Sequence, residues 1–476
     1  MIVPLSTIVL SLFVIRSFAD LNVGFSFYGN DFIEPSYILN KNWNTTTIVA
    51  QESIIQWADW LAAQGPWSVT TSTSILAPSN DTHDYISWAP YYWPNCTSIP
   101  NASGLTPQQV WVTCPYHQMD GQTNPDTRPV NNTGAFSALA DAVFYNTLAW
   151  AINGSSKYPT NVASWINTWF LASDTYMNPN LNYAQIVRGT GPGSNNGTGS
   201  HMGVLDLKSM TKIVSSVLVL RAGNAPGWTS AIDAGLVNWT TQYIGWLTTS
   251  PIALNESITP SNHGSYYYNQ LAALQILVND AASANATVQK YFSTLYLNQI
   301  NATGEQPFEM NRTRPYHFRT FNLAAMITNA RIGSYLGFDA WNLPTTYGAT
   351  IQTALDFTMA LPPGTEDGTE LYPDVGAVAA VYGDPNGTYV GYLSKGQQTY
   401  PANPWFFYTQ PLSDSGWVRA NAGRPGAATP SGTGPAGSTA SAAIGKNGAG
   451  SRISLGTYGQ LFFGTTTLVL LHVLLV

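Results

Sequence analysis

A helical hydrophobic pattern that recurs along most of the chain constrains the fold more than any other feature of the sequence. In residues 52–63 (ESIIQWADWLAA), Ile54, Ala58 and Leu61 recur at the three- and four-residue spacing of one helix face. Runs that alternate like β-strands are scarce. The same helical pattern returns at residues 134–152, 161–172, 208–220, 232–247, 266–278, 287–296, 318–336 and 351–360.

The connections between these predicted helices are long and rich in Gly, Pro, Asn and Tyr, and no strong composition break divides residues 21–416. Successive helical hairpins in one large domain favour an all-α fold, the α/α toroid. In this incomplete barrel, inner and outer helices surround a central cleft, and long rim loops line it.

The N-terminus predicts a signal peptide over residues 1–19. An apolar core at residues 8–15 precedes Ser17-Phe18-Ala19, a small-x-small cleavage pattern. The alternative, a membrane helix, needs about 20 apolar residues. We therefore expect export.

The C-terminus predicts a glycosylphosphatidylinositol (GPI) attachment signal. Small residues around Asn447 are followed by a polar spacer and by a terminal apolar run at residues 461–476. We expect attachment at Asn447, with Gly448 or Gly450 as alternatives. A transmembrane tail is the other reading, but no basic stop-transfer cluster follows the run.

The predicted organisation is a signal peptide (1–19), a toroid domain (20–418), a Gly/Ala/Ser/Thr/Pro-rich stalk (419–447) and a removed anchor signal (448–476). Thirteen Asn-x-Ser/Thr sequons predict a glycoprotein. In an oxidising compartment the two cysteines, Cys96 and Cys114, should form a disulfide. We expect an extracellular monomer at the cell surface or in the cell wall, held to the membrane only through the anchor.

Composition favours a carbohydrate partner. Only 9% of the residues are charged, whereas 13% are aromatic, and aromatic rings stack on sugar faces; we expect more than half of them to fill the core instead. The net charge of −7 argues against nucleic acid. It also opposes a polyanionic substrate, unless the few cations are concentrated in the cleft.

Two loop segments are candidates to line the cleft. Residues 81–94 (DTHDYISWAPYYWP) crowd rings beside prolines, a composition that suits sugar stacking. Residues 182–208 form a Gly-rich segment that lacks the Gly-Lys-Ser/Thr spacing of a phosphate loop, so nucleotide binding is not expected.

Two further segments carry groups that move protons and bind carboxylates. In residues 261–270 (SNHGSYYYNQ), His263 lies just before a helix predicted to start near Tyr266, and it can act as base or acid near neutral pH. In residues 306–326, three of the eighteen Lys and Arg residues lie close together with a Tyr and a His between them: Arg312, Arg314, Tyr316, His317 and Arg319.

These segments resemble the alginate-lyase family of polysaccharide lyases over residues 80–340. The resemblance rests on three motifs in the family's order: His83-Asp84-Tyr85 with Ala89-Pro90-Tyr91-Tyr92-Trp93-Pro94; Asn262-His263-Gly264; and Gln306-Pro307, Glu309, Arg312-Thr313-Arg314, His317 and Phe321-Asn322-Leu323. It implies an α/α toroid and β-elimination on an acidic polysaccharide such as alginate or glucuronan, with no metal or cofactor. Together with the anchor, it suggests a fungal surface enzyme.

The resemblance also implies residue roles. Asn262 and Arg312 would grip a uronate carboxylate, with Arg314 assisting, and His263 would take the C5 proton. The family's catalytic Tyr corresponds to Phe318, so Tyr316, or one of Tyr266, Tyr267 and Tyr268, would have to protonate the leaving oxygen. The remaining substrate contacts are expected from Trp88, Tyr91, Trp93, Gln185 and His317.

Two other functions remain open from the sequence. Phe318 is compatible with a surface protein that binds polysaccharide and cleaves it poorly or not at all; restoring Tyr at this position would separate the two. A toroidal glycoside hydrolase would need paired carboxylates. No such pair is indicated by the spacing of Asp84, Asp120, Asp206 and Glu309.

Overall fold

The computed structural model describes residues 31–41, 43–191 and 194–409. The chain divides into a unit over Met1–Gly426 and a second unit, Ala427–Val476. The predicted signal peptide, the stalk, the anchor residue Asn447 and the removed tail lie outside the described residues.

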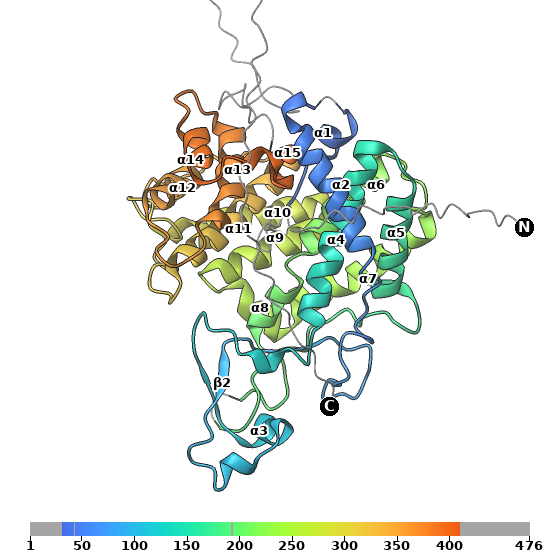
Figure 1. Cartoon of the computed structure of the whole chain (residues 1–476), viewed down its shortest axis with the longest axis vertical. Coiled ribbons are helices and arrows are strands. Elements are labelled where there is room, and N and C mark those ends of the chain that lie inside the picture. Colours follow the sequence, from blue (N-terminus) through green and yellow to red (C-terminus); the bar gives the residue numbers. More distant parts are fainter. Residues whose placement is uncertain (1–30, 42, 192–193, 410–476) are drawn as a thin grey trace, which may run out of the picture. The chain divides into compact units, whose positions relative to one another are not determined.

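Five helices form the inner layer of a toroid, and each contacts the next along the chain. Most of their residues are buried on every side. The fold is therefore the predicted all-α toroid (Figure 1). The inner helices are α4 (Asn132–Asn153), α6 (Met210–Ala222), α9 (Asn262–Leu277), α11 (Pro315–Tyr335) and α13 (Tyr372–Tyr382).

The outer helices each pack one face on this inner layer and leave the other face in solvent, as an amphipathic pattern requires. They are α5 (Lys157–Ile166), α7 (Ser230–Thr249), α10 (Ala281–Ser293), α12 (Ile351–Ala360) and α14 (Thr388–Gly396).

The first and last helices meet. Helix α15 (Pro404–Tyr408) contacts both α13 and α2 (Ile48–Ala62), and α2 packs on α4. The short α1 (Pro35–Leu39) contacts α6 and α4. Helix α4 is long and apolar enough to span a membrane by length and composition alone, but 78% of its apolar window is buried inside the protein. It is a core helix.

The predicted helices are present, with two informative differences. Helix α9 begins at Asn262, so Asn262-His263-Gly264 forms its first turn rather than a loop before it. The pattern at 161–172 is divided between α5 and a π-helical turn, Asn167–Leu171. The sequence analysis missed α13 (YPDVGAVAAVY) and α14 (TYVGYLSKG), which are short and contain Val and Gly, residues of low helix propensity.

Short elements in the rim loops carry much of the site. Strand β1 (Ile86–Trp88) pairs in parallel with β4 (Tyr183–Ile186), and β2 (Tyr92–Pro94) pairs antiparallel with β3 (Tyr116–Gln118). Beside them lie α3 (Pro107–Thr113) and α8 (Pro251–Ser257). The 3-10 turns are η2 (Thr45–Thr47), η3 (Ala102–Gly104), η4 (Pro125–Thr127), η6 (His201–Leu207), η7 (Leu295–Asn298), η8 (Gly368–Leu371) and η9 (Tyr400–Ala402).

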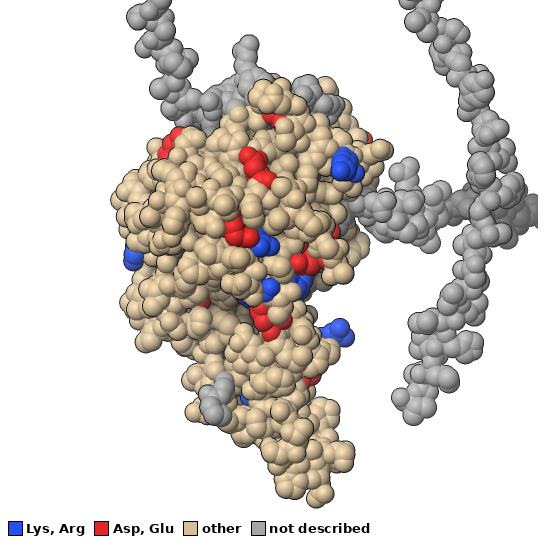
Figure 2. All heavy atoms as spheres, turned by 90° about the vertical axis from the view of Figure 1, so that its left-hand side faces the viewer, with Lys and Arg blue, Asp and Glu red and all other residues tan. Residues whose placement is uncertain are grey.

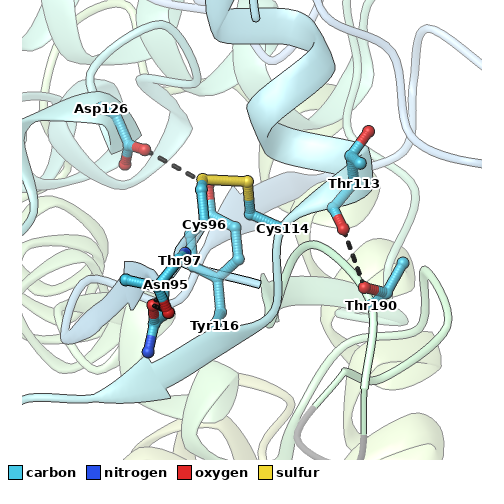
Figure 3. The surroundings of a disulfide bond; sticks show 8 residues. All are labelled: Asn95, Cys96, Thr97, Thr113, Cys114, Tyr116, Asp126 and Thr190. Atoms are coloured by element: carbon cyan, nitrogen blue, oxygen red, sulfur yellow. Dashed lines mark hydrogen bonds between the residues drawn. A yellow bond between two sulfur atoms is a disulfide. The ribbon is translucent and has the colours of Figure 1, made fainter. Parts of the chain in front are cut away.

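The predicted disulfide is confirmed. Cys96 follows β2 and Cys114 caps the C-terminal end of α3, with their Cα atoms 4.9 Å apart (Figure 3). The bond therefore links the C-terminal end of α3 to the residues that follow β2. Helix α3 itself has no buried residue that could hold it in place.

Replacing both cysteines, as Cys96→Ser/Cys114→Ser, should destabilise this loop region by about 3 kcal/mol, the loop-closure value for a cross-link of this length. Amide hydrogen exchange at β2 and β3 should accelerate accordingly, while exchange in α9 and α11 stays unchanged. Unaltered protection at β3 would show that the disulfide is not what holds the region together.

Candidate active site

The first turn of α9 places Asn262 and His263. Gly264 follows them, and a Cβ there would lie 2.2 Å from the carbonyl oxygen of Thr259. Only glycine permits this approach of the helix start to the preceding loop. The Asn-His-Gly motif is therefore a backbone requirement as well as a source of functional groups.

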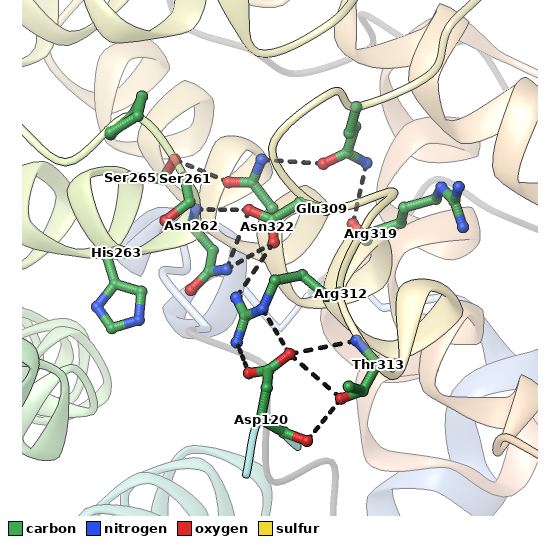
Figure 4. A network of polar contacts seen from close by, with 12 residues as sticks. Asp120, Ser261, Asn262, His263, Ser265, Glu309, Arg312, Thr313, Arg319 and Asn322 are labelled. Atoms are coloured by element: carbon green, nitrogen blue, oxygen red, sulfur yellow. Dashed lines mark hydrogen bonds and ion pairs between the residues drawn. The ribbon is translucent and has the colours of Figure 1, made fainter. Parts of the chain in front are cut away.

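Asn262 is buried and holds the carboxyl group of Glu309. Its backbone N–H donates to Glu309 Oε1 (2.8 Å), and its Nδ2 donates to Oε1 (3.0 Å) and Oε2 (2.9 Å) (Figure 4). Burial raises the pKa of Glu309, and the bonds from Asn262 and the charge of Arg312 only partly offset this. Because the amide donors of Asn262 point at Glu309, the predicted grip of Asn262 on a substrate carboxylate is not supported; its role here is to orient Glu309.

Arg312 is fixed on three sides. Its Nε and Nη2 donate to the two carboxylate oxygens of Asp120 (3.0 and 2.7 Å), and its guanidinium lies 3.6 Å from the ring centroid of Phe318. Nη1 lies 3.8 Å from Glu309 Oε2 and makes no hydrogen bond to any described residue. The side chain is 23% exposed, so part of this cation can be reached by an anionic ligand.

His263 is held by a buried carboxylate. Its Nδ1 lies 2.6 Å from Glu256 Oε1, and the second oxygen of Glu256 lies 2.6 Å from Nδ1 of His201. Burial of Glu256 opposes its ionisation, but the two histidines, His263 foremost, outweigh this and hold its pKa below the usual value. An ionised Glu256 accepts Nδ1–H, which leaves the Nε2 lone pair of His263 free to take a proton.

Asn262 and Arg312 therefore come from two distant stretches of chain and meet at Glu309, and His263 follows Asn262 directly in the first turn of α9 (Figure 4). Asn262 and Arg312 both contact this carboxyl, and the charges of Arg312 and His263 both oppose the rise in the pKa of Glu309 that burial causes. A base and a cation beside one another are what abstraction of a proton next to a carboxylate needs.

Tyr316 lies elsewhere. It is 2% exposed in the main core, and its hydroxyl is 3.2 Å from that of Tyr392. Burial raises its pKa far above the ordinary tyrosine value. The predicted role of Tyr316 as proton donor is not compatible with this position, because one step along a helix turns a side chain by about 100° and Tyr316 is two steps from Phe318.

The three tyrosines of α9 are also committed to the core. The hydroxyl of Tyr266 donates to the Phe321 carbonyl (2.9 Å), and that of Tyr267 donates to the Leu247 carbonyl (2.9 Å). Tyr268 is buried against Tyr291. None of the three is placed to protonate a leaving group.

Two predicted substrate contacts are enclosed by protein. Trp88 is 8% exposed, with the guanidinium of Arg188 4.2 Å from its ring centroid. His317 is buried, with Nδ1 2.7 Å from Glu370 Oε2. These positions leave neither ring a free face for a sugar, so both predictions fail.

The other predicted contacts remain accessible. Tyr91 and Trp93 are partly exposed, and Trp93 Nε1 donates to the Gln122 carbonyl (2.9 Å). Burial raises the pKa of Tyr91, while Arg312 and Arg314 oppose this shift, so its phenol lies near both arginines. Arg314 is 37% exposed and 3.9 Å from Glu370. Gln185 Nε2 donates to Asp206 (2.8 Å).

The sequence analysis assigned no role to Glu256, His201 or Lys208, and it named Asp120 only as a carboxylate without a paired partner. Neither Asp120 nor Glu256 belongs to a motif that the sequence analysis recognised. Only the fold brings Asp120 to Arg312 and Glu256 to His263. Lys208 lies 5.9 Å from the Phe321 ring, and its ammonium makes no ion pair with any described residue. Burial lowers its pKa.

The charged residues are few on the face shown in Figure 2, and most of that surface is uncharged. Those that are visible lie as mixed blue and red groups largely along one band rather than as a single-sign patch. Two cations of the candidate site have a carboxylate beside them: Arg312 pairs with Asp120, and Arg314 lies 3.9 Å from Glu370.

The family model for alginate lyases matches residues 68–367, which include every candidate site residue named above. The chain belongs to the alginate lyase family. It is thus a polysaccharide lyase, a carbon–oxygen lyase.

A solved alginate lyase from Bacteroides ovatus is 26% identical, with a TM-score of 0.69 over 82% of this chain and 99% of that one. The A1-III alginate lyase of Sphingomonas species A1 is 14% identical, with a TM-score of 0.39 over 74% of this chain and 89% of that one. Only the first is similar enough to support an argument. No curated protein matches the chain.

Proposed function

We propose that this lyase cleaves a 4-linked uronate polysaccharide, of alginate or glucuronan type, by β-elimination at the outer cell surface. The observation that carries the proposal is that Asn262 and Arg312 both contact Glu309, while His263, the residue after Asn262, is held by Glu256. The names of the related structures, which are alginate lyases, support a uronate as the substrate.

The C5 proton of a uronate becomes acidic only when charge on the adjacent carboxylate is offset and the developing enolate is stabilised. Arg312 can offset the charge of the carboxylate and stabilise the enolate through Nη1, because Asp120 and Phe318 already fix the rest of the guanidinium. Nε2 of His263 takes the proton, and Glu256 stabilises the imidazolium that forms. Asn262 keeps Glu309, and through it Arg312, in place.

Neighbouring sugars would contact the accessible groups near this centre. Tyr91 and Trp93 offer aromatic faces, Arg314 offers a second cation, and Gln185 offers an amide. Lys208, whose ammonium is unpaired among the described residues, suits the carboxylate of an adjacent uronate. The polymer would thus bind through several carboxylates although the protein is acidic.

The surface location is supported by chemistry along the chain. Eleven of the thirteen sequon asparagines are exposed, and the other two, Asn285 and Asn301, are partly exposed. The disulfide fits an oxidising compartment. In this proposal the stalk at 419–447 ends in a GPI anchor at Asn447.

Incubation with polymannuronate, polyguluronate and glucuronan tests the reaction. β-Elimination leaves a C4=C5 double bond, so ultraviolet absorbance should rise on at least one polymer. New reducing ends without absorbance would instead indicate a hydrolase. Bound polymer with neither signal would indicate a non-cleaving binding protein and would contradict the proposal.

A further inference from the structure

Two histidines share one buried carboxylate beside the site. His201, at the start of η6, and His263, in the first turn of α9, each place Nδ1 2.6 Å from a different oxygen of Glu256 in α8. Their ring centroids are 6.3 Å apart. Three separate elements therefore build one His–Glu–His unit.

The unit is buried at its centre and open at both ends. The side chain of Glu256 is fully buried, whereas His201 is 34% and His263 20% exposed. With both Nδ1 atoms directed at Glu256, both Nε2 atoms point away from it. Neither Nε2 has a hydrogen-bond partner among the described residues.

The proton count of this unit favours one base and one acid. A single buried negative charge balances a single imidazolium, since a second one would leave an uncompensated charge. The balanced state is therefore one neutral histidine, whose Nε2 accepts a proton, and one cationic histidine, whose Nε2 donates one.

The reaction needs such an acid. The oxygen expelled from C4 is a poor leaving group unless it is protonated, and Phe318 cannot donate a proton. The hydroxyls of Tyr266, Tyr267 and Tyr316 are held in the core by Phe321, Leu247 and Tyr392.

We propose that His201 is the general acid that protonates the leaving oxygen while His263 acts as the base; this rests on the proposed lyase function. His263 Nε2 takes the C5 proton, the C5–H electron pair becomes the C4=C5 double bond, and the C4–O4 bond breaks with its electrons on O4. The Nε2 proton of His201 then goes to O4. One histidine gains a proton as the other loses one, so the charge around Glu256 is the same before and after the step.

The test is His201→Asn, which keeps a side-chain donor for Glu256 but removes the Nε2 acid. On the polymer that responds in the ultraviolet assay, kcat should fall by about 10²-fold or more, the usual contribution of a general acid. Adding Phe318→Tyr to this variant should restore at least about ten-fold of the loss, because a phenol then stands where the family has its catalytic tyrosine.

A uronate that carries 4-nitrophenolate at C4 separates acid catalysis from a structural defect. This anion leaves without a proton, so His201→Asn should react with it at nearly the native rate, whereas His263→Asn should be impaired on both substrates. Equal losses on polymer and aryl substrate, or full activity of His201→Asn on polymer, would overturn the assignment. A native protein inactive on all uronate polymers would instead refute the proposed function.

Discussion

His263→Asn should lower kcat on the responsive polymer by about 10²–10⁴-fold, the range that a positioned general base contributes. Asparagine can still donate to Glu256, so the loss reflects the missing Nε2 rather than an unpaired buried carboxylate. The measurement is the initial rate of ultraviolet absorbance at saturating polymer, with circular dichroism to confirm folding.

His83→Asn is the matched control. Its Nδ1 also makes a short bond, 2.6 Å to the Tyr176 carbonyl, and its ring stacks on Tyr176 rather than on a residue that contacts Glu256 or Glu309. We expect near-native turnover from this variant. If His263→Asn retained more than a tenth of native kcat, proton abstraction by this imidazole would be excluded.

Arg312→Ala should lower kcat/KM by about 10²–10³-fold, the typical cost of removing one donor aimed at a developing oxyanion. In the proposed function Arg312 offsets the charge of the substrate carboxylate, and its Nη1 makes no hydrogen bond to any described residue. Arg312→Lys should recover little of this activity, because an ammonium cannot bond both oxygens of Asp120 and stack on Phe318 while reaching the substrate.

Steady-state kinetics on both variants, with thermal unfolding as a stability check, test this expectation. Lys157→Ala provides the control, since Lys157 also pairs with an aspartate (Asp59, 2.8 Å) but on the open surface. A rise in KM with unchanged kcat would mean that Arg312 binds the ground state only and does not stabilise the enolate.

The helices and the family were accessible from the sequence for different reasons. Amphipathic helices such as α12 show their period directly, and its predicted bounds, 351–360, match the structure. Helix α13 was missed because it is short and carries three Val, a Gly and a Pro, residues that do not favour a helix. The short motifs carried the family resemblance, since Gly264 and its neighbours are fixed by backbone geometry that a sequence records.

Individual roles within the motifs were less accessible. Tyr316 was a reasonable proton donor by proximity in sequence, but the helical rotation from Phe318 directs it into the core. Trp88 packs against Arg188, and His317 pairs with Glu370. A sequence motif does not distinguish such structural roles from sugar binding, because the distinction depends on burial.

The sequence by itself determined a helical toroid of the alginate lyase family, the Cys96–Cys114 bond, and the stretches of chain that supply a base and a cation. Only the tertiary structure decided what those groups can do. It brings Glu256 and His201 to His263, and Asp120 to Arg312, across 192 residues of chain in the latter case. The reason is physical: helical periodicity and turn geometry are local properties, whereas the proton affinity of a side chain and the direction in which it points depend on partners that folding alone places beside it.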